Sequence, residues 1–580
     1  MRISLLLAAA MALFGALLLL GETEKLPDYQ KLKQEHARMA AGGYDLVNLA
    51  SPRLFGAALK ALAHVIHLPV IGRILTGVLR KDNKVLEVRR FASSIPDMPL
   101  YNPYMDPVTS AKEPASPFSL DEFSRKGVHA AKDAATEFRQ WSIADYTSRY
   151  ASGEITPLQV ARAVLAAVEA NEKSAFPLRI FVEKYDELIL EQARASTQRY
   201  VEGKPLGVLD GVPVGIKDET QIKGHRTTAG TSFLGIDTGV ATEDSTVISR
   251  LRGAGAIILG KTNMHEIGAG VTGYNMHYGT VRNPYNPNHY PGGSSSGSAA
   301  LVASDCPSVC QIGPIAATVR DAAIGYAIMS GGDAAFPRSL SQPKVDLHSF
   351  EDTSSLKGVK VGYFSSYTNH STPEVAQAVE KALQALKARG AELIETKLSH
   401  LAAIHVAHSI VIGSEFAASF DKYHSRMSEF SPEVQLVVTY SRTFSTLDFL
   451  AAQKVRAFAL RQIQENVFSK VDVFVTPTTG MTAPEILPEA LEAGELNAEQ
   501  LGDIFRFSLY GNLIGMPGVA VPIGYDARGL PISIQFQANH WDEDMALRLA
   551  HTTERLYESV QKKPQVYFSI IDDAAKQPRD

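Results

Sequence analysis

The 580-residue sequence predicts an α/β fold, with a sheet that helices cover on both faces. Amphipathic helix patterns alternate with short apolar strand patterns through most of the chain, which is typical of this fold class. With 45% apolar and 21% charged residues, the composition is that of a globular protein. Because a chain of this length buries roughly 75% of its unfolded surface, we expect a large core in one extended domain or two domains.

Charge and cysteine content exclude two classes of protein. The 57 basic and 62 acidic residues leave a net charge of -5 without a long run of either sign. This argues against an electrostatic nucleic-acid binder. The chain has two cysteines, Cys306 and Cys310, which excludes a disulfide framework but leaves one local bridge open.

The N-terminal residues predict a membrane segment. Residues 3–21 carry one polar side chain, Ser4, and as a helix they would span roughly 28 Å, close to the thickness of a bilayer core. We therefore expect a transmembrane anchor over residues 1–21. The alternative is a cleaved signal peptide with Arg2 as its basic region, although no small-x-small cleavage site follows the apolar run. Lysines and arginine flank both sides, so charge leaves the orientation open.

Residues 22–135 are predicted to be an extension with a second apolar segment at 54–79. This segment contains Lys60, His64, His67 and Arg73, and Pro69 interrupts it. Sparse basic residues on an apolar helix suit the membrane interface, and a helix packed on the main domain is the equal alternative. A second complete span is not expected. Residues 96–128 are rich in Pro, Ser and Asp, which predicts a polar linker.

The main domain is predicted at residues 136–565, followed by a tail at 566–580. Capping boxes at Ser142 and Thr156 predict two helix starts. Thr372 and Pro373 open a further helix, which Gly390 closes. Apolar runs predict strands at 209–216, 256–259, 392–395, 472–475 and 519–522. A further helix is expected at 244–252, just before the strand at 256–259.

Two short motifs suggest chemistry but lie in the wrong context. Residues 255–262 (GAIILGKT) match a phosphate-binding loop, yet the residues between the two glycines look like the strand itself. Residues 293–297 (GSSSG) match a hydrolase elbow with Ser295 as nucleophile. That elbow needs a preceding apolar strand, whereas a Pro- and Asn-rich stretch precedes it here. We expect neither function.

A third combination joins Lys217, which ends an apolar strand, with the serine-rich residues 292–298 before a helix. Burying an ammonium ion favours the neutral amine, so a lysine in this position could act as a base. Free N–H groups at the helix start would favour developing negative charge near the serines. The plainer alternative is that Lys217 pairs with Asp218 or Glu219 and that the serines cap the helix.

These residues lie in stretches that resemble the amidase signature family. The stretches are GVPVGIKDE (211–219), GAIILGKTNMHEIG (255–268), YGTVRNPYNPNHYPGGSSSGSAA (278–300), VDVFVTPTTGMTAP (471–484) and NLIGMPGVAVPIGYDARGLPISIQ (512–535). They occur in family order between about residue 140 and about residue 560. Residues 54–83 further resemble plant-type fatty acid amide hydrolases.

The resemblance implies a large twisted mixed sheet covered by helices and an amidase with a Ser–cis-Ser–Lys site. Lys217 would be the neutral base and Ser294 the bridging serine, held by a Gly293–Ser294 cis peptide. The implied substrates are lipophilic N-acyl amides such as N-acylethanolamines, without a metal or organic cofactor. His265 and Glu266 lack a further histidine at metal-binding spacing and are interpreted as structural.

The sequence departs from the family where the nucleophile is expected. Family members have a glycine-rich turn whose serine attacks the amide, whereas residues 303–311 here (ASDCPSVCQ) lead directly into a later family segment. On the order of forty residues are missing, including the nucleophile and oxyanion-binding N–H groups worth several kcal/mol. Thr318, Cys306 and Cys310 are weak substitutes, since none has an activating environment in the sequence. A skipped exon or an erroneous gene model explains the gap more simply.

We therefore expect an impaired fatty-acid-amide-hydrolase-like amidase, with a non-catalytic lipid-amide-binding protein as the alternative. Amide transfer linked to tRNA is disfavoured by the N-terminal apolar run and the absence of a basic patch. The expected partners are a lipophilic amide and a membrane, without nucleic acid, and the location is an endomembrane or the secretory pathway. The oligomeric state stays open, with a homodimer as one option. Asn369 begins a glycosylation sequon.

Overall fold

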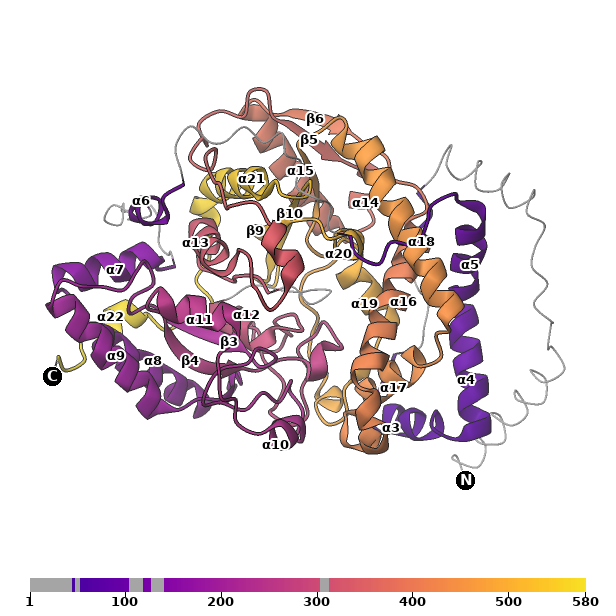
Figure 1. Cartoon of the computed structure of the whole chain (residues 1–580), viewed down its shortest axis with the longest axis horizontal. Helices are drawn as coiled ribbons and strands as arrows, with labels where there is room; N and C mark the ends of the chain where they lie inside the picture. The colour runs from indigo at the N-terminus through magenta and orange to yellow at the C-terminus, as the bar shows by residue number, and fades with distance from the viewer. Residues whose placement is uncertain (1–43, 47–52, 104–117, 127–139, 303–311, 580) are drawn as a thin grey trace.

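The computed structural model describes residues 44–46, 53–103, 118–126, 140–302 and 312–579 (Figure 1). The predicted membrane anchor at 1–21, part of the linker, and both cysteines lie outside the described residues. The α/β fold is confirmed, because helices alternate with strands along the chain and pack on two main sheets.

The larger sheet has five strands in the order β6-β5-β7-β10-β9. It is mixed: β5 runs parallel to β6 and β7, whereas β10 is antiparallel to β7 and β9. The strand predicted at 392–395 is confirmed, and those at 472–475 and 519–522 are confirmed with shifted ends. The strands are β5 (Lys360–Tyr363), β6 (Glu392–Glu395), β7 (Val473–Pro477), β9 (Gly518–Tyr525) and β10 (Pro531–Ala538).

The smaller sheet has the order β2-β4-β3, with bounds Phe181–Glu183 for β2, Ile257–Thr262 for β4 and Pro213–Lys217 for β3. The strand predicted at 209–216 is wrong in its first half, where the chain turns. Asp210 stabilises that turn by accepting hydrogen bonds from the Leu206 N–H and the Arg199 guanidinium. The strand β4 continues through Lys261, which the prediction left outside it.

Helices cover both faces of the five-stranded sheet, as predicted. Strand alternation divides β7 between two apolar clusters. Val473 and Val475 pack with helices α13, α15 and α21, whereas Phe474 packs with α5, α16, α18 and α20 (Figure 1). These helices are α5 (Val85–Ser94), α13 (Val319–Met329), α15 (Pro373–Ala388), α16 (Leu401–Ser419), α18 (Thr446–Ile463), α20 (Leu509–Ile514) and α21 (Glu543–Leu556).

The three-stranded sheet is covered in the same way. Ile257 and Leu259 pack with α8 and α9, whereas Ile258 faces the cluster that contains α11. The capping boxes at Ser142 and Thr156 are both formed, confirming the two helix starts. The C-terminal α22 packs on α8. These helices are α7 (Ile143–Ser152), α8 (Pro157–Glu172), α9 (Asp186–Val201), α11 (Thr246–Gly253), α12 (Ser296–Val302) and α22 (Ile570–Ala574).

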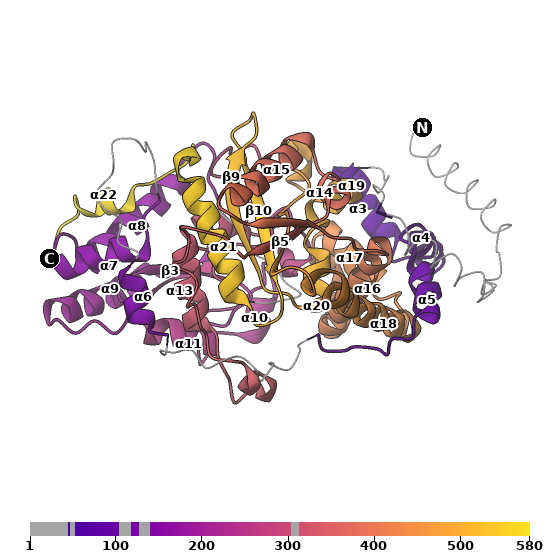
Figure 2. The same cartoon turned by 90° about the horizontal axis from the view of Figure 1, so that it is seen from above.

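The single large sheet implied by the resemblance is present as two sheets within the described residues. The strand β3 ends the smaller sheet and β9 ends the larger one, and no described strand joins them. Seen from above, the smaller sheet with α8 and α9 and the larger sheet form neighbouring halves of the molecule (Figure 2).

The apolar segment at 54–79 forms two helices, α3 (Gly56–Val65) and α4 (Pro69–Asp82), bent by 110° at Pro69. Leu59, Ala63 and Ile66 pack against Leu436 of α17 (Pro432–Ser441). Within the described chain, α16 is the single straight helix long and apolar enough to cross a membrane. That helix packs against α5, α17, α18 and α20, so its environment is that of a core helix. In the linker region, α6 (Leu120–Arg125) is a helix that the sequence did not predict.

Candidate active site

The two predicted site residues, Lys217 and Ser294, lie side by side although 77 positions separate them in the chain. Lys217 ends β3, and its Nζ donates to Ser294 Oγ at 2.8 Å. The Gly293–Ser294 peptide bond is cis, as the resemblance implied. A lysine amine and a hydroxyl in hydrogen-bond contact can pass a proton between them.

The serine-rich turn is held by the loop that follows β4. The His265 N–H donates to the Ser294 carbonyl at 2.9 Å, and the Gly297 N–H donates to the Asn263 carbonyl at 2.7 Å. A Cβ atom at Gly297 would lie 2.3 Å from the Ile180 carbonyl oxygen, so the close approach requires glycine here. Sequence reasoning did not assign Asn263, although it lies in the quoted stretch 255–268.

Lys217 also makes an ion pair, with Glu219 Oε1 at 3.1 Å. The sequence left open that Lys217 is simply an ion-paired lysine, with Asp218 or Glu219 as its partner. The pair with Glu219 is present, and Lys217 contacts Ser294 as well. The other possible partner, Asp218, points away from Lys217 and pairs with Lys261 at 3.3 Å. The serine hydroxyls do not behave as simple helix caps, because the buried Ser295 Oγ has no hydrogen-bond partner among the described residues.

The Asp218–Lys261 pair is fully buried directly behind the site. Burial raises the pKa of Asp218 and lowers the pKa of Lys261, while each charge opposes the shift of the other. Asp218 also accepts hydrogen bonds from the Thr228 and Gly230 N–H groups, both at 3.2 Å. The pair therefore fixes the turn after β3 against β4. A lysine within an apolar strand pattern was the signal that could have revealed it.

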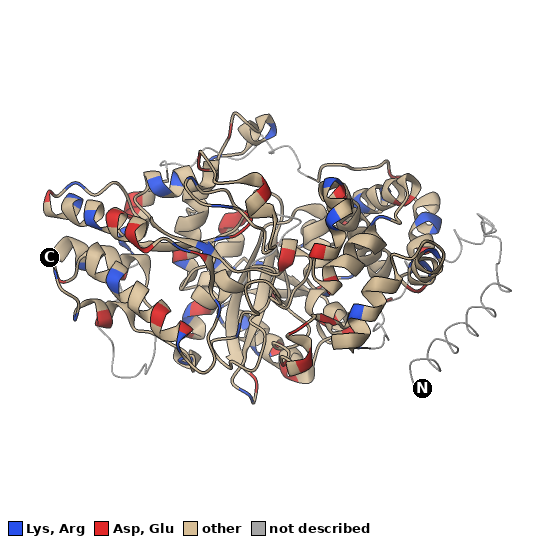
Figure 3. Ribbon diagram, turned by 90° about the horizontal axis from the view of Figure 1, so that it is seen from below, with Lys and Arg blue, Asp and Glu red and all other residues tan. Residues whose placement is uncertain are grey.

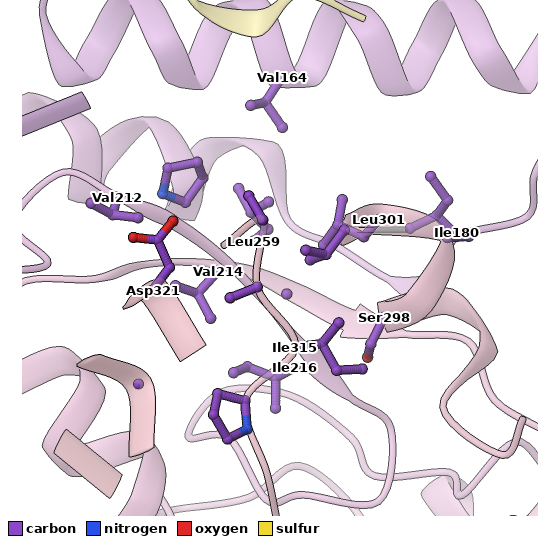
Figure 4. A pocket seen from close by; sticks show the side chains of 18 of the residues that line it. Val164, Ile180, Val212, Val214, Ile216, Leu259, Ser298, Leu301, Ile315 and Asp321 are labelled. Atoms are coloured by element: carbon purple, nitrogen blue, oxygen red, sulfur yellow. The ribbon is translucent and has the colours of Figure 1, made fainter. Parts of the chain in front are cut away.

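An apolar cavity of about 430 Å³ opens beside Lys217. Figure 4 shows side chains from several elements around it, among them Val164, Val214, Leu259 and Leu301, with Ser298 and Asp321 as polar members. Ser295 also lines the cavity, and Lys217 lies at its wall. The site thus joins a lysine–serine pair to an apolar space, an arrangement suited to a ligand with a polar group and an apolar chain.

The competing motifs do not form sites. Residues 257–262 of the formal phosphate-loop pattern are β4 itself, and no strand precedes Gly293 in the elbow pattern. Thr318 is the N-cap of α13, where its hydroxyl accepts from the Asp321 N–H. Among the described residues, no three His, Cys, Asp or Glu side chains gather in a way that could hold a metal ion.

Beneath the cis bond lies a buried pair of titratable groups, His265 and Glu433. His265 Nε2 is 3.6 Å from Glu433 Oε1. Burial, followed by the positive charge of Lys217, lowers the pKa of His265 to about 3. Burial raises the pKa of Glu433 to about 8, and the nearby carboxylates of Glu495 and Glu266 add to this. Both groups are therefore mostly neutral at pH 7.

We expect Glu433→Gln to flatten the dependence of stability on pH. The folded pKa of Glu433 lies above its ordinary value of 4.5, so the folded state keeps a proton that the unfolded state has lost. Stability falls as pH rises from about 4.5 to about 8, by up to about 5 kcal/mol at about 1.4 kcal/mol per pKa unit. Thermal unfolding midpoints between pH 5 and pH 8 should fall less in Glu433→Gln than in the native chain. The exposed Glu374→Gln is the control, and parallel curves for Glu433→Gln and the native chain would contradict the assignment.

Comparison with protein-family models finds the amidase family, matched by residues 162–309 and 305–547. The two matched segments meet at residues 305–309, which is where the sequence departs from the family pattern. The chain is 34% identical to the fatty acid amide hydrolases of Medicago truncatula and Arabidopsis thaliana. These matches cover 91% and 94% of this chain and 96% and 99% of the relatives.

The fold is similar to solved amidase structures. The native peptide amidase of Stenotrophomonas maltophilia superposes with a TM-score of 0.60 at 23% identity, covering 75% of this chain and 99% of that one. A bacterial aryl acylamidase gives a TM-score of 0.63 at 21% identity, covering 76% of this chain and 99% of that one. The family match, the plant relatives and the shared fold agree, and the chain belongs to the amidase signature family.

Proposed function

We propose that this chain is a fatty-acid-amide-hydrolase-type protein that binds lipophilic N-acyl amides and, in the form given by this sequence, hydrolyses them little or not at all. Lys217 would be the base and Ser294 the bridging serine. Their 2.8 Å contact, beside an apolar cavity that Lys217 lines, carries the proposal. The plant relatives are named for fatty acid amide hydrolysis, and their similarity extends over nearly the whole chain.

The break in the family match supports impairment. The alignment with the Medicago truncatula relative spans 594 positions, more than this chain possesses, although it uses 91% of the chain. Residues of the relative without a counterpart here must therefore exist. The described site offers no serine, threonine or cysteine in contact with Ser294 Oγ that could act as nucleophile, since its one hydrogen-bond partner there is Lys217. Without an activated nucleophile the lysine–serine pair cannot form an acyl-enzyme.

An amide-transfer function is the weaker candidate. Glutamyl-tRNA amidotransferase A subunits are 30–33% identical but cover 62–73% of this chain, whereas the plant hydrolases cover more than 90%. In the view of Figure 3, Lys and Arg of the described residues are interspersed with Asp and Glu, and the net charge of the chain is -5, whereas RNA binding favours a basic face.

Binding and turnover can be measured separately. The chain contains two tryptophans, and Trp141 lines the cavity beside Lys217. In a Trp541→Phe background, titration with N-palmitoylethanolamine should change the Trp141 fluorescence in a saturable way. Mass spectrometry should detect little or no palmitate release from the same samples. Absence of saturable binding would contradict the proposed ligand class, and rapid release would contradict impairment.

We further propose that the bend between α3 and α4 contacts a membrane. Leu68, Val70 and Ile71 are exposed there by 40%, 65% and 36%, while the opposite side of α3 packs on α17. Of the exposed basic residues of the two helices, Arg73 comes two positions after Ile71, whereas Lys60 pairs with Glu492 and Lys81 lies at the far end of α4. The sequence left two alternatives for this segment, a helix packed on the main domain and a helix at the membrane interface. In this proposal one side of the segment is packed and its tip lies at the interface.

An environment-sensitive dye should report this contact. With Cys306 and Cys310 replaced by serine, a dye on Val70→Cys should shift its emission to the blue when vesicles are added. The same dye on Val201→Cys, at the 77%-exposed end of α9, is the matched control and should not shift. Equal responses at the two positions would contradict an interfacial role for the bend.

A further inference from the structure

The loop that follows β4 contacts both partners of Lys217. A Cβ atom at Gly268 would lie 3.6 Å from Ser294 Oγ and 3.9 Å from Glu219 Oε2, so the main chain at Gly268 lies against these two side chains. Lys217 Nζ donates to Ser294 Oγ at 2.8 Å and pairs with Glu219 Oε1 at 3.1 Å. The path of this loop therefore decides where the two groups that hold the amine can lie.

The same loop holds the main chain around Ser294. A Cβ atom at Gly293 would lie 2.7 Å from the Gly273 nitrogen and 3.0 Å from the Val271 carbonyl carbon, so the two backbones are in contact. At the start of the loop, the His265 N–H donates to the Ser294 carbonyl at 2.9 Å. Ser294 is thus supported at its own carbonyl and at the residue before it.

The imidazole ring of His265 fills the space beside this loop. The side chain is 1% exposed. A Cβ atom at Gly270 would lie 2.2 Å from the ring atom Cε1 and 2.4 Å from Nε2, and Thr272 Oγ1 lies 3.5 Å from Nδ1. Because the ring and the loop are close-packed, loss of the ring would let the loop move into the vacated space and away from Ser294.

The helix α17 holds the ring from another element. Glu433 Oε1 lies 3.6 Å from His265 Nε2. The N–H of Ser431, the N-cap of α17, donates to Glu266 Oε2 at 2.8 Å, and the other oxygen of Glu266 bonds to His277 Nε2 at 2.9 Å. The start of α17 is therefore attached to the residue that follows His265, which fixes the ring relative to the helix.

We propose that His265, held by Glu433, is a positioning residue that keeps Ser294 Oγ in contact with Lys217. It acts through residues 268–273 and through its main-chain hydrogen bond to Ser294. A neutral ring suits this role, since burial and the positive charge of Lys217 lower the pKa of His265 to about 3. The proposal rests on the proposed function in one respect, because it takes Lys217 and Ser294 as the working pair.

The reactivity of the Lys217 amine reports its contacts. Sulfo-N-hydroxysuccinimide acetate acetylates free amines, and peptide mass spectrometry of the full-length chain in detergent gives the rate at each lysine. His265→Ala should raise the rate at Lys217 about tenfold, because the hydrogen bond to Ser294 is lost. His265→Gln places an amide near the position of Nε2 and should keep most of the native rate. The exposed Lys381 is the reference within each sample.

A double-mutant cycle separates positioning from general loosening of the fold. Ser294→Ala removes the hydroxyl itself and should raise the Lys217 rate to a similar degree. If His265 acts through Ser294, the combination of His265→Ala with Ser294→Ala reacts no faster than Ser294→Ala alone. His408→Ala removes an equally buried histidine of α16 and should leave the Lys217 rate unchanged.

Three results would overturn the positioning role: a native Lys217 rate in folded His265→Ala, effects of His265→Ala and Ser294→Ala that multiply in the double variant, or an equal increase in His408→Ala. Thermal unfolding identifies the folded variants. If His265→Ala does not fold, Glu433→Ala takes its place, because it removes the group that holds the ring. Its Lys217 rate should rise in the same Ser294-dependent way, and an unchanged rate contradicts the role.

Ligand binding is a separate readout. If the Lys217 rates respond as expected but N-palmitoylethanolamine leaves the Trp141 fluorescence of the Trp541→Phe chain unchanged, the positioning role stands and the proposed ligand class is contradicted. If the ligand binds while the Lys217 rate does not respond to His265→Ala, the proposed function stands and the positioning role is contradicted.

Discussion

Inserting the nucleophile segment that we propose to be missing should turn this chain into an active amidase. With the residues of the Medicago truncatula relative placed between Ser304 and Ile312, we expect release of palmitate from N-palmitoylethanolamine to rise by at least ~10³-fold. Loss of a single oxyanion donor costs ~10²–10³, and we propose that the nucleophile is missing as well. Steady-state rates of the native and restored chains, measured in the same detergent, provide the comparison.

Variants of the restored chain test whether its activity depends on Lys217 and Ser294. Lys217→Ala and Ser294→Ala in the restored chain should each return the rate to near that of the native chain, because they remove the base and the bridging hydroxyl. Ser298→Ala removes a hydroxyl that also lines the cavity but bonds to Thr262, and it should keep most of the activity. A native chain as fast as the restored one would show that no catalytic group is missing.

Replacing Lys261 by methionine should produce the largest loss of stability among single substitutions near the site. Asp218 would keep its buried carboxylate but lose the ion-pair partner 3.3 Å away. Removing one member of a buried pair typically costs about 3–5 kcal/mol. Urea unfolding followed by circular dichroism should show this as a lower midpoint. Lys381→Met, at an exposed position of α15, should have little effect.

A double variant distinguishes the ion pair from packing. Asp218→Asn with Lys261→Met removes both charges, and the amide oxygen keeps an acceptor for one of the two N–H groups, that of Thr228 on Oδ1 or that of Gly230 on Oδ2. Its unfolding free energy should recover a large part of the loss caused by Lys261→Met alone. If the double variant is no more stable than Lys261→Met, the loss comes from packing of the lysine stem and the ion-pair account is wrong.

Much of the fold follows from local sequence signals. Capping boxes at Ser142 and Thr156 located two helix starts, and the apolar run closed by Gly390 located α15 and β6. Such signals act within a few residues and need no tertiary information. The strand expected from residue 209 failed because Asp210 binds Arg199 of helix α9, a partner that local periodicity cannot reveal.

The sequence predicted the two central residues of the candidate site, but it did not predict the buried pairs of titratable groups around them. Family motifs placed Lys217 and Ser294 in one site, and the structure shows them in contact. The buried partners, Asp218 with Lys261 and His265 with Glu433, come from segments far apart in the sequence. Which charges pair depends on the parallel alignment of β3 with β4 and on the position of α17, and both are tertiary features.

Labelling with a fluorophosphonate probe tests the central claim most directly, because the probe reacts covalently with an activated serine nucleophile. The purified native chain should remain unlabelled, while the restored chain should label in a way that Lys217→Ala abolishes. Labelling of the native chain that is lost in Lys217→Ala or Ser294→Ala would contradict the claim that this chain holds the lysine–serine pair without a nucleophile.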